Sequence, residues 1–331
     1  MEIYKPGMAY IGKILTLSEI PEADFILRAD VVCGKGGKWS GVVRKDISEG
    51  DRVVVFLPDS IVPKDNPELS FMEKNNWRVR PMRLRGCPSE VLIMPIKVMG
   101  IEGEIGVDVT DLLKVMKYEK EIPASLSGLM KGNFPAFIPE TDEPNFQIVP
   151  ELRQALIGCE CCITTKYDGS SQTFYHYNGQ LGGCSRNWEL QDTQSAAVWA
   201  IAKQFNLIEE LPRFGNIALQ WEVVGPKIQG NPLKLSKIEP RLFDIWNIDN
   251  QQYLGRDVLV EFAELIGMPY VTGMRIIYQD FTDDELCKMA EGLYEESGRQ
   301  REGIVIRPIT EMRIEGQRLS FKVLNLLYKE N

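Results

Sequence analysis

Residues 163–184 read ITTKYDGSSQTFYHYNGQLGGC and predict three β-strands joined by two turns. Ile163–Lys166 and Ser171–Tyr177 are rich in β-branched and aromatic residues, which favour strands. Asn178-Gly179 is typical of a two-residue hairpin turn and leads into a third strand at Gln180–Cys184. Lys166 closes the first strand, and Tyr167-Asp168-Gly169 follows it. This stretch therefore presents an amine and a carboxylate at a turn that can face a ligand.

The sequence after residue 140 mixes strands and helices without a regular β-α-β alternation. The further strands expected there are Ala218–Val224, Arg241–Ile248, Gly303–Arg307 and Leu319–Val323. The helices expected there are Thr193–Gln204, Asp257–Ile266 ended by Gly267, and Asp283–Leu293 with a capping box of Thr282 and Glu285. This pattern predicts an α+β fold with antiparallel sheets flanked by helices.

The first segment of the chain predicts short strands separated by turns. They are Met8–Leu17, Phe25–Val32, Trp39–Val43, Val53–Leu57, Met82–Leu84 and Val91–Met94. Closely spaced strands without helices between them indicate a small barrel, for which an OB-fold is one option. A helix is expected at Asp108–Lys117. We therefore expect an OB-fold-like domain at residues 1–121, a Pro-, Gly- and Ser-rich linker at 122–139, and a second domain at 140–331.

The composition narrows the classes of function. The chain carries 38 basic and 47 acidic residues, a formal charge of −9, so it should bind a polyanion only where basic groups gather. Seven cysteines without paired spacings do not suit a structural zinc site. A single histidine, His176, disfavours Ser-His or Cys-His catalysis. No apolar run could cross a membrane and no signal-peptide stretch follows Met1, so a cytoplasmic protein without membrane contact is expected.

One local gathering of basic groups lies between residues 74 and 85, which contain no acidic residue. Its members are Lys74, Arg78, Arg80, Arg83 and Arg85. Arginine side chains suit phosphate oxygens because their planar donors match the anion. The alternative is a solvated, charge-rich loop, and the sequence does not separate the two.

Several motifs follow Lys166-Tyr167-Asp168-Gly169 in order along the chain. They are Ser185-Arg186-Asn187, residues 220–225 (QWEVVG), 242–245 (LFDI), 302–307 (EGIVIR) and Lys322. A K-x-D-G match alone arises by chance in about one chain in ten of this length, given average residue usage. The ordered set resembles the covalent nucleotidyltransferase superfamily of ATP-dependent ligases and mRNA capping enzymes. Thr141-Asp142-Glu143, 225–231 (GPKIQGN) and 320–325 (SFKVLN) resemble its RNA ligases, in the subgroup with an N-terminal OB-fold module.

The resemblance implies ATP as cofactor, with Lys166 attacking its α-phosphorus to form lysyl-AMP. The implied nucleotide-binding residues are Lys166, Gly169, Arg186, Glu222, Phe243 and Lys322. Arg186 would contact the phosphate or ribose, Glu222 a ribose hydroxyl, and Phe243 the adenine ring. Lys322 would neutralise the α-phosphate. Without the resemblance, Phe243 is simply a core strand residue.

The resemblance also implies a divalent metal, Mg²⁺ or Mn²⁺, held by Glu143, Asp168 and Glu302, partly through water. Lysine normally titrates near 10.4, so Lys166 must lose its charge before it attacks. A metal ion beside it would disfavour the protonated form. From sequence alone, Glu302 could equally form an ordinary surface pair with Arg307.

The implied reaction joins a 3′-hydroxyl to a 5′-phosphate end that AMP has activated, with nicked RNA or an RNA-containing duplex as partner and a monomer expected. Ser320 departs from the pattern, since many relatives have a lysine there, and Arg318 or the basic residues 74–85 could compensate. Because the sequence ends soon after Lys322, no C-terminal OB domain like that of DNA ligases and capping enzymes is expected, which disfavours both activities. Those activities, and a non-catalytic nucleic-acid-binding module, are the alternatives.

Overall fold

The computed structural model describes residues 7–118, 128–193 and 195–329, and the chain forms two compact units. One comprises residues 1–120 with 146–150, and the other comprises residues 121–145 with 151–331. Part of the stretch expected as a linker, residues 122–139, lies outside the described residues. Within the rest of it, β10 (Met130–Asn133) pairs with a strand of the second unit, because Gly132 and Asn133 lie opposite Glu189 and Trp188.

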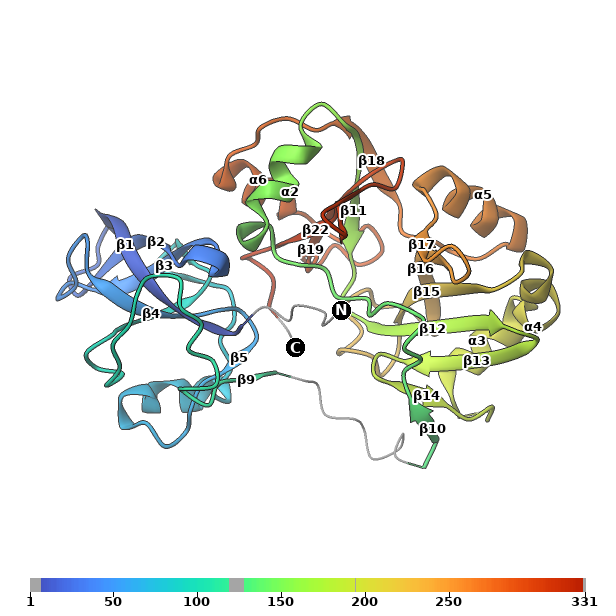
Figure 1. The fold of residues 1–331 in the computed structure, drawn as a ribbon, viewed down its shortest axis with the longest axis horizontal. Helices are drawn as coiled ribbons and strands as arrows, with labels where there is room; N and C mark the ends of the chain where they lie inside the picture. The colour runs from blue at the N-terminus through green and yellow to red at the C-terminus, as the bar shows by residue number, and fades with distance from the viewer. Residues whose placement is uncertain (1–6, 119–127, 194, 330–331) are drawn as a thin grey trace. The chain divides into compact units, whose positions relative to one another are not determined.

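The first unit is built on a five-stranded antiparallel sheet in the order β3-β2-β1-β4-β8 (Figure 1). Gly41 on β3 also bridges to Val91, beside β8, so the two ends of the sheet meet as in a barrel. Its elements are β1 (Ala9–Glu19), β2 (Ile26–Val32), η1 (Gly34–Gly36), β3 (Lys38–Arg44), β4 (Arg52–Phe56), β5 (Ser60–Ile61), η2 (Pro67–Asn75), β6 (Met82–Leu84), β7 (Cys87–Ser89), β8 (Leu92–Pro95), β9 (Met116–Lys117) and η3 (Phe146–Ile148).

The strands of this sheet bury side chains on both faces. Tyr10 and Trp39 belong to one buried cluster, and Phe56 belongs to a second cluster with Leu69 and Met72 of η2. Successive side chains of a strand point to opposite faces, so the β-branched runs of β1 and β4 supply both clusters.

The prediction of a helix at Asp108–Lys117 is wrong. The structure has turns there, followed by β9 at Met116. The Asp108 carboxylate accepts the Thr110 backbone N–H at 2.9 Å, and Lys114 has a φ of 54°, which no α-helix accommodates. Val109 and Val115 are buried, so turns rather than a helix pack the apolar side chains of this stretch.

The second unit contains a seven-stranded antiparallel sheet, β10-β14-β13-β12-β15-β16-β17, and a four-stranded antiparallel sheet, β18-β11-β19-β22. Its strands beyond β10 are β11 (Glu160–Lys166), β12 (Ser170–Tyr177), β13 (Gln180–Ser185), β14 (Trp188–Leu190), β15 (Ile217–Val224), β16 (Glu239–Asn247), β17 (Gln252–Tyr253), β18 (Gly273–Ile277), β19 (Gly303–Pro308), β20 (Arg313–Ile314), β21 (Gln317–Arg318) and β22 (Phe321–Leu324). The fold is α+β with antiparallel sheets, as the sequence predicts.

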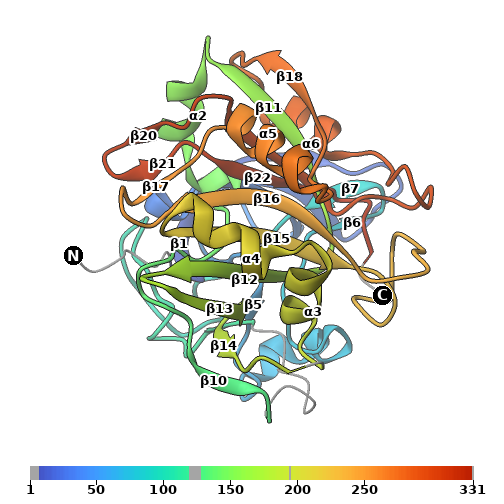
Figure 2. The same ribbon diagram turned by 90° about the vertical axis from the view of Figure 1, so that its right-hand side faces the viewer.

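The helical elements are α2 (Pro150–Leu156), α3 (Ala197–Gln204), α4 (Leu207–Glu210), η4 (Leu211–Phe214), α5 (Arg256–Ile266) and α6 (Asp283–Ala290). Figure 2 shows α3 and α4 over one face of the seven-stranded sheet. Trp199 of α3 packs edge-on against Phe174 of β12, and Leu207 of α4 belongs to the same buried cluster. Gly267 ends α5 with a φ of 68°, and the capping box of α6 is present. These local signals are confirmed.

The chain passes from one sheet of this unit to the other between β11 and β12. β11 lies inside the four-stranded sheet, β12 lies inside the seven-stranded sheet, and only Tyr167, Asp168 and Gly169 separate them. The turn that carries the K-x-D-G motif is therefore the point at which the two sheets meet.

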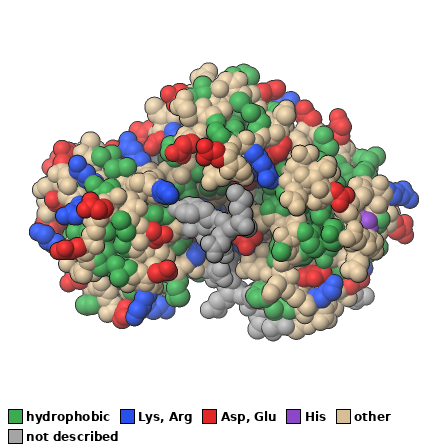
Figure 3. All heavy atoms as spheres, viewed as in Figure 1, with side chains coloured by type: hydrophobic (Ala, Val, Ile, Leu, Met, Phe, Trp, Pro, Cys, Tyr) green, Lys and Arg blue, Asp and Glu red, His purple; other side chains and the backbone are tan. Residues whose placement is uncertain are grey.

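The surface of the described residues carries both signs of charge. Figure 3 shows acidic and basic side chains interspersed over the face drawn. No helix within residues 7–118, 128–193 and 195–329 combines the length and the apolar character needed to cross a bilayer.

Candidate active site

Lys166 is the last residue of β11, and the register of the four-stranded sheet places it beside Glu302. Lys166 lies opposite Gly303 on β19, so the residue before β19 reaches the same corner. Lys166 Nζ lies 2.6 Å from Glu302 Oε1. The two side chains are 25% and 18% exposed, so this is a largely buried ion pair. The sequence predicted both residues for the site, and the fold brings them into contact.

Charges around Lys166 favour its protonated form. Burial opposes the charge, but the carboxylates of Glu302, Glu222 and Asp168 outweigh burial and raise the pKa of Lys166 above its ordinary value. Burial in turn raises the pKa of Glu302, against the opposing charge of Lys166. The resting site therefore holds an ammonium group among three carboxylates.

The Asp168-Gly169 turn fits closely against β15. Ser170 and Ser171 of β12 lie opposite Val223 and Glu222. A Cβ added to Gly169 would lie 2.4 Å from the Val223 backbone oxygen and 2.8 Å from Glu222 Cγ. Only glycine allows the turn to approach the strand this closely. Gly169 thus brings the carboxylate of Glu222 toward the lysine corner.

Lys322 lies on the same face of the four-stranded sheet as Lys166. It pairs with Val305, which pairs with Thr164, two residues before Lys166. Side chains two residues apart on a strand share a face. The positive charge of Lys322 lowers the pKa of Glu302 and so opposes the larger effect of burial, which shows that Lys322 lies near this carboxylate. The structure therefore assembles Lys166, Lys322 and Glu302 in one place.

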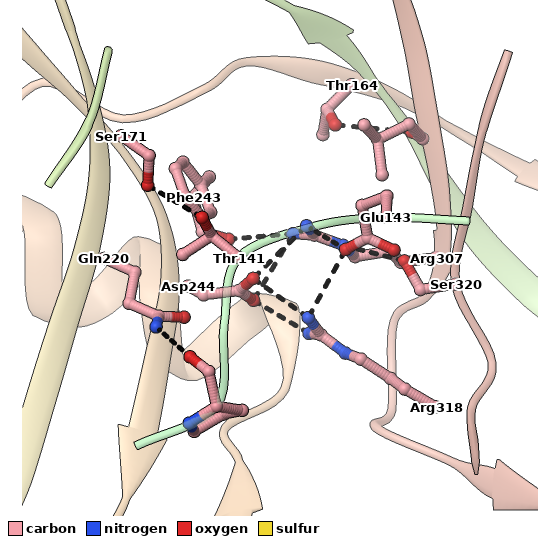
Figure 4. Close-up of polar contacts among 12 residues, drawn as sticks. Thr141, Glu143, Thr164, Ser171, Gln220, Phe243, Asp244, Arg307, Arg318 and Ser320 are labelled. Carbon is pink, nitrogen blue, oxygen red and sulfur yellow. Dashed lines mark hydrogen bonds and ion pairs between the residues drawn. The ribbon is translucent and has the colours of Figure 1, made fainter. Parts of the chain in front are cut away.

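Glu143 lies in a cluster of arginines and carboxylates that links the two sheets (Figure 4). Arg307 Nη2 contacts Glu143 Oε1 at 2.7 Å and Asp244 Oδ2 at 3.2 Å. Arg318 donates two hydrogen bonds to Asp244, at 2.8 and 2.9 Å, and two to Glu311, at 2.7 and 2.9 Å. Burial opposes the charge of Glu143, but the two arginines lower its pKa below its ordinary value.

The structure does not assemble the expected metal trio of Glu143, Asp168 and Glu302. Within the described part of the chain, no group of three His, Cys, Asp or Glu side chains could hold a metal ion. Glu143 pairs instead with Arg307 at 2.7 Å and with Arg318 at 3.8 Å. Asp168 and Glu302 remain suited to a hydrated Mg²⁺, because the buried Glu302 Oε2 has no hydrogen-bond partner.

Phe243 occupies a β-bulge in β16. In the ladder with β15, Asp244 pairs with Gln220 and Leu242 pairs with Trp221, which leaves Phe243 without an opposite residue. Bulges re-aim side chains and are frequent beside active sites. The Phe243 backbone oxygen accepts a hydrogen bond from Arg307 Nη1 at 2.9 Å, and its ring is half-buried. The sequence located this aromatic residue but not the bulge.

Comparisons with known proteins decide the family. An RNA ligase family model matches residues 160–324, and an OB-fold domain model matches residues 8–96. Solved structures of an RNA ligase from Naegleria gruberi are similar over almost the whole chain. The structure with PPi is 32% identical, with a TM-score of 0.82 and 97% coverage of each chain. The chain belongs to the RNA ligase family.

Two further Naegleria gruberi RNA ligase structures agree. A lysine-to-alanine variant with ATP and Mn is 31% identical, with a TM-score of 0.83 and coverage of 96% of this chain and 97% of that one. A glutamate-to-alanine variant with AMP and Mn is also 31% identical, with a TM-score of 0.83 and 97% coverage of each chain. A search of curated proteins gave no match. The predicted RNA ligase family and N-terminal OB-fold are confirmed.

Arg186 of this RNA ligase, which the sequence predicted to bind the nucleotide, is paired with Asp142. Its Nη2 lies 2.6 Å from Asp142 Oδ1, and the side chain is 49% exposed. The next residue back, Thr141, hydrogen-bonds Ser171 of β12 at 2.8 Å. The Thr141-Asp142-Glu143 motif therefore runs from the seven-stranded sheet to the arginine–carboxylate cluster, which the sequence could not show.

The basic residues expected to bind nucleic acid differ in their surroundings. Arg78 is buried, pairs with Asp59 at 2.6 Å and lies 3.9 Å above the Tyr118 ring, so its guanidinium is engaged within the first unit. Arg80 is half-buried. Arg83 lies on β6, and its side chain is outside the described residues. Arg85 is exposed at the turn between β6 and β7.

Proposed function

We propose that this RNA ligase is ATP-dependent, carries AMP on Lys166, and seals a 3′-hydroxyl to a 5′-phosphate in nicked RNA or RNA-containing duplexes. The observation that carries this proposal is the buried contact of 2.6 Å between Lys166 Nζ and Glu302 Oε1 at the junction of the two sheets. Naegleria gruberi RNA ligase structures with ATP, AMP and Mn support the same choice of cofactors. The residues substituted in two of those structures are a lysine and an aspartate two positions after it. Lys166 and Asp168 have the same spacing in this chain.

The first step forms a bond between Lys166 Nζ and the α-phosphorus of ATP and breaks the bond to the β-phosphate oxygen, releasing pyrophosphate. The ammonium nitrogen loses two protons as it becomes the phosphoramidate; Glu302 Oε1, 2.6 Å away, would accept one, and the other would leave to solvent. Lys322, on the same face, would neutralise the α-phosphate. A magnesium ion near Asp168 and Glu302 would supply positive charge that disfavours the ammonium form of the lysine.

The nucleotide would lie against the residues that the sequence predicted. Phe243 would stack on the adenine from its bulge, and Glu222 would accept a hydrogen bond from a ribose hydroxyl. Arg186 would release Asp142 and contact the phosphate or ribose of the nucleotide instead. Glu143, whose carboxylate contacts Arg307, would join Asp168 and Glu302 in holding the metal ion through its bound water.

The later steps transfer AMP from Lys166 to the 5′-phosphate and then join the ends. The phosphate oxygen attacks the AMP phosphorus and releases the Lys166 amine, and the 3′-hydroxyl then displaces AMP. The N-terminal unit would bind the nucleic acid through Arg85, together with Arg83, rather than through the buried Arg78. A double Arg83→Ala and Arg85→Ala variant should seal nicks less well, with a smaller salt dependence of binding.

The deciding experiment is a mass measurement of the protein after incubation with ATP and Mg²⁺. We expect a gain of one AMP that peptide mapping places on Lys166, and no gain in Lys166→Ala. A wild-type protein that gains no mass contradicts the proposal. Nicked duplexes with RNA or DNA on each side of the break then define the substrate, and sealing of all-DNA nicks alone would identify a DNA ligase instead.

A further inference from the structure

A tyrosine that no sequence motif marks lies directly behind the lysine corner. The Tyr294 side chain is 1% exposed, and its hydroxyl contacts three backbone groups. The Tyr294 hydroxyl oxygen accepts hydrogen bonds from the backbone N–H of Asp168 at 3.0 Å and from that of Glu302 at 3.1 Å. It donates to the backbone oxygen of Lys166 at 3.3 Å. One oxygen atom therefore joins the two segments, 166–168 and the residue before β19, that carry the reactive amine and the two proposed metal carboxylates.

These contacts replace bonds that the sheets cannot supply. Asp168 lies in the turn between the two sheets, and Glu302 precedes β19. Both N–H groups therefore lie outside the strands, where the hydrogen bonds of a β-sheet do not reach them. Buried backbone donors without partners are costly. The tyrosine satisfies both, and its own position is fixed by a hairpin in which its N–H bonds the Arg299 oxygen at 2.8 Å. Its ring stacks on Tyr167, with centroids 5.6 Å apart.

A second tyrosine fixes the Asp168 side chain. Tyr328 Oη donates to Asp168 Oδ2 at 2.6 Å, and the Asp168 side chain is buried. Tyr328 follows β22, the strand of Lys322, and Asn325 holds this end of the chain by donating to the Arg301 oxygen at 2.8 Å. With one carboxylate oxygen held, Asp168 keeps a fixed orientation at the site.

We propose that Tyr294 and Tyr328 are positioning residues of the adenylylation step, and this inference rests on the proposed function. Tyr294 acts through the backbone of Lys166, Asp168 and Glu302, and it sets the distance between nucleophile and carboxylates. Tyr328 acts through the Asp168 carboxylate and sets its orientation toward a metal ion. Hydrogen bonds of this kind behind reacting groups hold the geometry that the reaction needs.

The variants Tyr294→Phe and Tyr328→Phe remove only a hydroxyl and keep the ring. Tyr175→Phe is a matched control, because Tyr175 is also buried and donates to a carboxylate, Glu189, at 2.8 Å. We expect Tyr294→Phe to slow AMP transfer to Lys166 at saturating ATP by about 10–100-fold, with the KM for ATP changed by less than about 2-fold. The control should change both by less than about 2-fold, with a similar loss in Tm.

Metal binding gives a second readout that does not require turnover. In the Lys166→Ala background, calorimetric titration of Mn²⁺ in the presence of ATP should show about 10-fold weaker binding when Tyr328→Phe is added. Equal Mn²⁺ affinity would overturn the role of Tyr328. A Tyr294→Phe rate equal to that of Tyr175→Phe would overturn the role of Tyr294.

The two proposals fail separately. If the wild-type protein acquires no AMP, the proposed function fails. If Tyr294→Phe and Tyr328→Phe acquire AMP as fast as the wild-type protein, only the positioning roles fail. Should Tyr294→Phe not fold, Tyr328→Phe alone tests the inference, since Tyr328 is half-buried near the end of the chain.

Discussion

Arg307 donates a hydrogen bond at 2.9 Å to the backbone oxygen of Phe243, the one residue of β16 without an opposite partner on β15. The bulge is therefore held from the other sheet, because Arg307 belongs to β19. The same guanidinium contacts Glu143 and Asp244. One side chain thus couples the proposed adenine-stacking residue to the frame that joins the two sheets.

Loss of the Phe243 ring should weaken ATP binding. Base–aromatic stacking contributes about 1–3 kcal/mol, so Phe243→Ala should raise the KM for ATP by roughly 5–150-fold. The measurement is the ATP dependence of AMP transfer to Lys166. Phe137→Ala is a control that removes another partly exposed ring of the same unit. A KM unchanged in Phe243→Ala would place the adenine elsewhere.

Loss of the Arg307 guanidinium should destabilise the second unit. Arg307→Met leaves Glu143 and Asp244 with Arg318 alone, and breaking a buried pair by removing one partner costs about 3–5 kcal/mol. We expect a loss of this order in the free energy of unfolding in urea. Arg213→Met removes a surface pair with Glu210 whose arginine is 70% exposed, and it should change stability by less than about 1 kcal/mol. Equal losses in the two variants would refute the structural role of Arg307.

A methyl group at Gly169 should disturb the turn. The added Cβ of Gly169→Ala would lie 2.4 Å from the Val223 oxygen, a backbone atom that cannot move cheaply. We expect a stability loss of about 1–3 kcal/mol and strongly reduced AMP transfer, because Glu222 is displaced with Val223. Gly132→Ala is the control, since an added Cβ there meets nothing within 4 Å. Full activity in Gly169→Ala would show that the turn can relax.

The cysteines should react with alkylating agents according to burial. Burial raises the pKa of Cys33 and of Cys161 to about 12, so both stay as neutral thiols at pH 8, and only the thiolate is an efficient nucleophile. We expect iodoacetamide to modify the half-buried Cys159 and Cys287 in the folded protein and to reach Cys33 and Cys161 only after unfolding. Peptide mapping by mass spectrometry measures this order, and early labelling of Cys33 would contradict it.

The local signals in the sequence predicted local structure well. Asn178-Gly179 forms the expected tight turn, with φ values of 49° and 77°. Thr282 and Glu285 form the expected cap. Both depend on residues within a few positions of each other, so side-chain chemistry alone specifies them. The helix expected at Asp108–Lys117 was wrong, because turns rather than a helix bury Val109 and Val115 there.

The sequence by itself indicated the RNA ligase family, because the order and type of the motifs around Lys166 and Asp168 are recognisable without any coordinates. Only the tertiary structure decided which carboxylate meets which cation. Glu302 meets Lys166 because two strands pair in one register, while Glu143 meets Arg307 across more than 160 positions of the chain. Such partners depend on the packing of distant strands, and no spacing along the chain encodes them. Tyr294 reaches the site in the same way, through a hydroxyl whose three backbone contacts exist only in the folded protein.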